Sequence, residues 1–86
     1  MSKVVKRLKD RPMGHIVEHE NGNFYYVDSA YTFDHGLETM VFYCEPDGDK
    51  HKVDWGELHM RLHGTYTEME NYHFWLIDNL EKVDLS

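Results

Sequence analysis

Hydrophobic and polar residues alternate along much of the first two thirds of the chain. In residues 24–33, aromatic and β-branched side chains recur at every second position, as in a strand with one buried face. Residues 37–45 alternate in the same way, and residues 15–19 and 51–55 are shorter runs of this kind. The pattern therefore predicts four strands in a small antiparallel meander.

Short turn sequences separate these runs. Glycine adopts a positive φ without strain, and asparagine does so more readily than most residues, so both favour tight hairpin connections. The predicted turns are Asn21-Gly22-Asn23, Asp34-His35-Gly36 and Pro46-Asp47-Gly48-Asp49.

The stretch after residue 53 has the features of a helix start. Asp54 and Glu57 have the spacing of a capping box, although Asp replaces the usual Ser or Thr. Leu58 and Leu62 then lie one helical turn apart, and Gly64 is a suitable stop. A short helical element between Asp54 and Gly64 is therefore predicted.

The C-terminal residues predict a longer amphipathic helix. Thr67 and Glu70 repeat the capping-box spacing with the usual residue types. A strand over residues 72–77 is the competing interpretation. Apolar residues follow Thr67 at steps of three and four, as an amphipathic helix requires, at Met69, Tyr72, Leu76, Leu80 and Val83.

Charge is distributed unevenly along the chain. Residues 1–11 contain five bases and one acid, a net charge of +4, whereas the other 75 residues contain four bases and fifteen acids, a net charge of −11. The sign of a protein's field selects its partners, and phosphate contacts dominate nucleic-acid affinity. The acidic part is therefore excluded as a conventional nucleic-acid binder.

The basic N-terminal segment admits three interpretations: one or two helical turns, a short edge strand, or a mobile arm. Pro12 and Gly14 end any helix there. We divide the chain accordingly into a basic arm, residues 1–12, and a single β-rich domain, residues 13–86.

Length and composition bound the remaining possibilities. The chain has 86 residues, enough for one domain, and twelve of them are Phe, Trp or Tyr, which supply a core. Cys44 is the single cysteine, so no internal disulfide forms and a reducing compartment is expected. No apolar stretch has the length of a membrane span or a signal-peptide core. We therefore expect a cytoplasmic protein.

Seven histidines and one cysteine raise the question of a metal- or thiol-dependent enzyme. On a helix His59 and His63 would share a face, and Asp54 or Cys44 could add a third ligand. The helical zinc-protease motif needs Glu directly after its first His, where this chain has Met60. We favour solvated or core-edge histidines and a buried cysteine, and expect no metal and no cofactor.

One ordered set of residues in the first half of the chain comprises Gly14, His19, Gly22, Tyr26, Ala30, Leu37-Glu38, Val41 and Tyr43. In this order of residues, the segment 14–43 resembles a small family of SH3-like barrels found in bacteria and their phages. The resemblance implies an SH3-like barrel and no particular activity, because none is established for that family. The chain departs from the family after Trp55, where the short Trp-Val-Arg-Pro-type ending is missing.

The fold expected is mainly β, of the α+β class: a small antiparallel sheet or SH3-like barrel with one C-terminal helix. The function expected is a non-enzymatic, acidic binding protein that occupies a basic site on a larger protein, such as the nucleic-acid channel of a host enzyme. If the chain is phage-encoded, it would act as an inhibitor in the host cytoplasm. The carboxylates that would stand in for phosphates are those of Asp28, Asp34, Glu38, Glu45, Asp47 and Asp49.

Two other functions stay open at this point. One is the metal- or thiol-dependent enzyme, and the other is a nucleic-acid accessory protein that binds through the basic arm. The sequence also leaves open a homodimer in which the arm docks on the acidic surface of a second copy.

Overall fold

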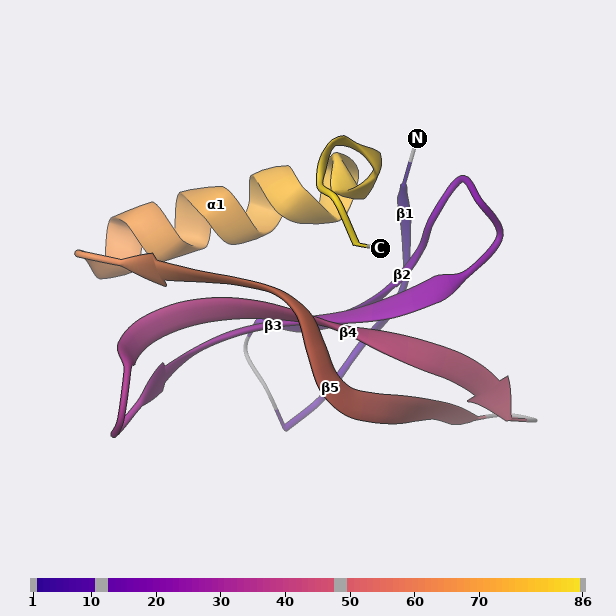
Figure 1. The fold of residues 1–86 in the computed structure, drawn as a ribbon, viewed down its shortest axis with the longest axis horizontal. Helices are drawn as coiled ribbons and strands as arrows, with labels where there is room; N and C mark the ends of the chain where they lie inside the picture. The colour runs from indigo at the N-terminus through magenta and orange to yellow at the C-terminus, as the bar shows by residue number, and fades with distance from the viewer. Residues whose placement is uncertain (1, 11–12, 48–49, 86) are drawn as a thin grey trace.

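The computed structural model describes residues 2–10, 13–47 and 50–85. Over these residues five antiparallel strands form one sheet in the order of the sequence, and one α-helix covers one face of it (Figure 1). The predicted α+β class is therefore confirmed. The elements are β1 (Lys3–Arg7), β2 (Gly14–Glu18), β3 (Phe24–Thr32), β4 (Gly36–Asp47), β5 (Lys50–His63), α1 (Tyr66–Asp78) and the 3-10 helix η1 (Leu80–Lys82).

The sheet is open. Its strand order places β1 and β5 at opposite edges. Of the two predicted architectures, an antiparallel sheet or a barrel, the described strands therefore form the sheet. Three of the predicted strands correspond to β2, β3 and β4 with ends shifted by one or two residues. Gly22 and Gly36 have positive φ values of 90° and 76°, as the predicted turns require.

The basic N-terminal segment is the edge strand β1. It pairs with β2, with Lys3 opposite Glu18 and Arg7 opposite His15. Exposed Lys and Arg side chains suit a sheet edge because they oppose pairing with another chain. Residues 3–7 thus form the short edge strand that was one of the three interpretations of this segment.

Ser2, just before β1, forms hydrogen bonds with the 3-10 helix η1. Its hydroxyl oxygen accepts a hydrogen bond from the Leu80 backbone N–H at 3.0 Å, and the hydroxyl donates to Glu81 Oε2 at 3.1 Å. Sequence reasoning contained no signal for this contact, because the residues are 78 and 79 positions apart.

The predicted short helix after Asp54 is wrong. The residues form the second half of β5, which pairs with β4 along its length from Asp47 opposite Lys50 to Leu37 opposite His63. Asp54 Oδ1 does accept a backbone hydrogen bond, from Gly56 N–H at 3.1 Å, but this closes a local bend and no helix. Pairing with a long neighbouring strand outweighs a weak helical signal.

The helix is correctly predicted, but its start lies two residues earlier than the sequence suggested. Thr65 is the N-cap, and its side chain accepts a hydrogen bond from the Glu68 N–H at 3.1 Å. Glu68 Oε2 accepts from the Gly64 N–H at 3.1 Å. This reciprocal arrangement resembles a capping box shifted by one residue, and it begins α1 directly after β5.

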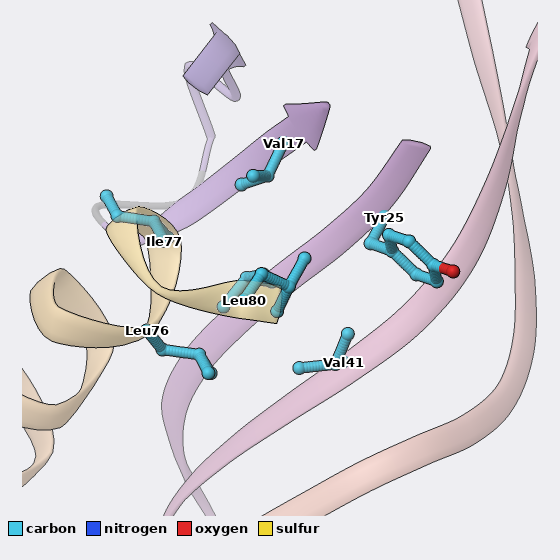
Figure 2. Packing of buried hydrophobic residues seen from close by; sticks show 7 residues of the cluster. Val17, Tyr25, Val41, Leu76, Ile77 and Leu80 are labelled. Atoms are coloured by element: carbon cyan, nitrogen blue, oxygen red, sulfur yellow. The ribbon is translucent and has the colours of Figure 1, made fainter. Parts of the chain in front are cut away.

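The main apolar core lies between α1 and the sheet (Figure 2). Leu76, Ile77 and Leu80 project from the helical segment onto strands β2, β3 and β4. Each fully buried aliphatic side chain contributes about 1.5–3 kcal/mol, so this contact holds the helix on the sheet. The strand residues in the cluster are Val17, Tyr25, Val27 and Val41.

Candidate functional site

The sheet face opposite α1 carries a second apolar cluster, and no helix of the described residues covers it (Figure 1). Its buried members come from alternate positions of β2, β3 and β4, so they point away from the core shown in Figure 2. We call this surface the helix-free face. Its buried residues are Ile16, Tyr26, Phe42 and Cys44, and Leu8, Phe24, Met40 and Val53 pack against them.

Strand β5 bends sharply in its middle (Figure 1). Its pairing with β4 shifts register between Val41 and Phe42 and again between Phe42 and Cys44. Such irregularities bend a strand and redirect its side chains. The bend places the Trp55 ring against Phe42 and Tyr26, at centroid distances of 5.2 and 6.1 Å and in edge-to-face geometry.

Trp55 and Tyr31 are large aromatic residues that remain mostly in solvent. They are 67% and 70% exposed, although burial of such rings is strongly favourable. Between them lies a pocket of about 240 Å³, which we call the acid–aromatic pocket. Its lining residues are Asp28, Ala30, Tyr31, Thr32, Glu38, Met40, Phe42 and Trp55.

Two carboxylates line this pocket from adjacent strands. The register of β3 and β4 sets Asp28 opposite Met40 and Ala30 opposite Glu38, so both acids point to the helix-free face. Asp28 Oδ1 accepts a hydrogen bond from the Tyr26 hydroxyl at 3.0 Å.

The carboxylate of Glu38 is less well satisfied. Glu38 is only 3% exposed, and its buried Oε2 has no hydrogen-bond donor. His35 Nδ1 lies 3.4 Å from that oxygen, within ion-pair range, on a side chain that is more than half exposed. A buried charged oxygen without a donor is costly. The pocket beside it is the place from which a ligand could supply one.

The five predicted site residues that the structure describes do not form a single exposed row. Asp28 and Glu38 are buried in the pocket, whereas Asp34, Glu45 and Asp47 are exposed. Asp49 lies outside the described residues. Asp34 precedes β4 and Glu45 lies nine positions beyond its first residue, so at about 3.3 Å per residue they are roughly 30 Å apart. Of the five described residues, the structure brings together Asp28 and Glu38, and sequence reasoning missed their aromatic neighbours Tyr31 and Trp55.

A buried chain of hydrogen bonds crosses from the sheet to the helix on the opposite face. His15 Nδ1 lies 2.8 Å from His73 Nε2, and His73 Nδ1 lies 2.6 Å from Ser29 Oγ. Ser29 Oγ lies 2.7 Å from Thr39 Oγ1, which is 2.9 Å from His63 Nε2. We call these five residues the histidine–hydroxyl chain.

The Ser29–His73 pair has the residue types of nucleophilic catalysis but not the setting. Ser29 is 5% exposed and His73 is fully buried. Both ring nitrogens of His73 are occupied, one by Ser29 and the other by His15, where a catalytic triad has a carboxylate. Burial, reinforced by the positive field of His15, lowers the pKa of His73 to about 4. The histidine–hydroxyl chain therefore joins α1 to the sheet through neutral imidazole rings.

The histidines proposed as metal ligands contact an aromatic residue and a cation. His59 Nε2 lies 2.7 Å from the Tyr72 hydroxyl, and the His63 ring packs on the same tyrosine. The Arg61 guanidinium lies 4.8 Å from the centre of the Tyr72 ring. Burial and the charge of Arg61 lower the pKa of both histidines. A fixed cation here also opposes a metal ion.

The other proposed metal ligands lie elsewhere. Cys44 is fully buried on the helix-free face, and burial raises the pKa of its thiol, which makes it a poor nucleophile. Asp54 is exposed near the bend of β5. Within residues 2–10, 13–47 and 50–85, no three His, Cys, Asp or Glu side chains gather closely enough to hold a metal ion.

No protein-family model matches this chain, and no match was found among curated proteins or among solved structures. Over the described part of the chain, none of the helical segments has the length and apolar character needed to cross a membrane. What the protein does must therefore be inferred from the chemistry of its own surfaces.

Proposed function

We propose that the protein is a non-enzymatic binding module that receives a basic segment of a larger cytoplasmic protein on its helix-free face. The observation that carries this proposal is the buried Glu38 carboxylate without a hydrogen-bond donor, beside a pocket flanked by the exposed rings of Trp55 and Tyr31. A carboxylate and exposed aromatic rings together favour a cation that also has apolar surface.

The net charge supports a basic partner. At −7 the protein attracts positively charged surfaces and repels nucleic acid. Exposed apolar side chains on β5 add contact area, and they include Leu58, Met60 and Leu62. As expected from the sequence, the partner would present a basic site. Because Asp28 and Glu38 are buried, this site would contact one pocket and not a row of six carboxylates that mimic phosphates.

Titration of the isotopically labelled 86-residue chain with a short Lys- and Arg-rich peptide tests the proposal by NMR. We expect the amides of β3, β4 and β5 around the pocket, and the Trp55 indole N–H, to shift first. A peptide with Glu at the basic positions should have no effect. Raising the salt concentration should weaken the interaction, since exposed charges are screened.

Two exposed tryptophans provide a matched pair of variants. Trp55→Ala should reduce peptide binding, whereas Trp75→Ala, which alters an exposed tryptophan on α1, should leave it nearly unchanged. Absence of binding at low salt, or shifts confined to α1, would contradict the proposal. Shifts confined to β1 would instead indicate contacts between copies of the chain or through the basic edge strand.

A further inference from the structure

We propose that the acid–aromatic pocket takes the guanidinium group of a single arginine of the partner. This inference rests on the proposed function and specifies its chemistry. A pocket of about 240 Å³ is smaller than the roughly 300–1,000 Å³ typical of small-molecule sites, so it suits one inserted side chain.

The unsatisfied carboxylate requires a ligand with N–H donors. Glu38 Oε2 has no hydrogen-bond donor among the described residues, and its ion-pair contact is the exposed His35 ring at 3.4 Å. Asp28 Oδ1 already accepts from the Tyr26 hydroxyl. A guanidinium has five N–H groups in a planar fork that matches a carboxylate. A quaternary ammonium has none and would leave the oxygen unsatisfied.

The walls of the pocket favour arginine over lysine. Trp55 contacts Phe42 and Tyr26 in edge-to-face geometry, and most of its surface remains exposed. Guanidinium groups stack on aromatic rings and are less strongly hydrated than ammonium groups, so they lose less on entering such a site.

The charges around the pocket point the same way. None of the eight residues that line it is Lys, Arg or His, and two of them are carboxylates. The cavity beside Trp75 offers a contrast, because Arg61 and His63 line it. His35 approaches Glu38 from outside the pocket, and its exposed ring leaves room for it to move when a stronger donor enters.

A series of peptides with one variable central position tests the inference by isothermal titration calorimetry. The peptides keep the same flanking lysines and carry arginine, citrulline, lysine or trimethyllysine at the centre. We expect arginine to bind best, and its neutral isostere citrulline to bind about tenfold or more weakly, as for loss of a charged hydrogen bond. Equal binding of arginine and citrulline, or tighter binding of lysine or trimethyllysine, would overturn the inference.

Two isosteric variants locate the interaction. Glu38→Gln should remove most of the preference for arginine over citrulline, whereas Glu45→Gln, which loses the same charge at an exposed site outside the pocket, should retain it. Circular dichroism confirms that both variants are folded. If Glu38→Gln keeps the full preference, the inference fails.

The outcomes separate the two proposals. If every peptide in the series binds on the helix-free face with similar affinity, the binding module stands and the arginine pocket falls. If no basic peptide binds at any salt concentration, the proposed function itself falls.

Discussion

His73 Nε2 lies 2.8 Å from His15 Nδ1 in the buried contact between α1 and the sheet. One ring must donate a hydrogen bond and the other accept it, so at least one nitrogen of the pair carries no proton. If both rings were fully protonated, two cations would face each other in the core. This hydrogen bond therefore adds to the apolar contact between helix and sheet only while the pair is not doubly charged.

The first prediction concerns acid stability. The pKa of His73 is lowered from 6.5 to about 4, so between these values the unfolded chain binds a proton that the folded protein excludes. Stability is full above pH 6.5 and falls as the pH drops towards 4. A shift of this size corresponds to about 3 kcal/mol. Urea unfolding followed from about pH 7.5 to about pH 4.5 measures it.

Carboxylates also titrate in acid, so a variant is needed to isolate the histidine. His73→Gln cannot be protonated in this range and should flatten the pH dependence, even though it lowers stability at neutral pH. His15 has its pKa lowered by burial and by Arg7, so it adds a smaller effect of the same sign. An unchanged pH dependence in His73→Gln would show that His73 is not responsible.

The second prediction concerns Thr39, which links Ser29 to His63. Thr39→Val keeps the shape of the side chain but removes one hydrogen-bond partner of the buried Ser29 hydroxyl and the partner of the half-buried His63 ring. We expect a loss of about 1–3 kcal/mol in the free energy of unfolding. Thr67→Val, an equivalent change at an exposed position of α1, should change it by less than about 0.5 kcal/mol. Equal effects of Thr39→Val and Thr67→Val would argue that the histidine–hydroxyl chain contributes nothing to the free energy of unfolding.

The third prediction links the pocket to stability. In the free protein the Oε2 of the buried Glu38 carboxylate has no hydrogen-bond donor, and its ion-pair contact is the exposed His35 ring at 3.4 Å. Glu38→Gln removes the charge at constant size, and we expect it to raise the free energy of unfolding by about 1 kcal/mol. Thermal unfolding with Glu45→Gln as the control measures the effect. A large loss of stability in Glu38→Gln would mean that the carboxylate is already well satisfied.

The fourth prediction distinguishes two positions for the helix cap. Thr65→Ala removes the acceptor for the Glu68 N–H and should cost about 1 kcal/mol. Thr67→Ala lies inside the first turn of α1 and should be neutral or slightly stabilising, because alanine is the better helix former. The reverse order of effects would support the helix start that the sequence suggested.

The fifth prediction concerns Cys44. Its thiol is fully buried and burial raises its pKa, so a thiol-reactive dye should label the native protein only through opening of the fold. Labelling should become fast in urea above the unfolding transition. Fast labelling of the native protein at neutral pH would revive the thiol enzyme as an alternative.

The sequence by itself determined the class of the fold, because period-two alternation and the three- and four-residue steps of α1 are local properties. It also fixed two turns, at Gly22 and Gly36, where a positive φ favours glycine. It could not decide β5. Leu58 and Leu62 are four residues apart, and that spacing puts side chains on one face of either a helix or a strand.

Only the tertiary structure decided the rest. Pairing with β4 makes residues 50–63 a strand, and its register shifts aim Trp55 at Phe42. Cross-strand register brings Asp28 and Glu38 into one pocket, whereas Asp34, Glu45 and Asp47 do not line it. These arrangements depend on contacts between residues distant in the chain, and no local pattern encodes them. The net charge could therefore be predicted from the sequence, but the position of the pocket where carboxylates and aromatic rings lie together could not.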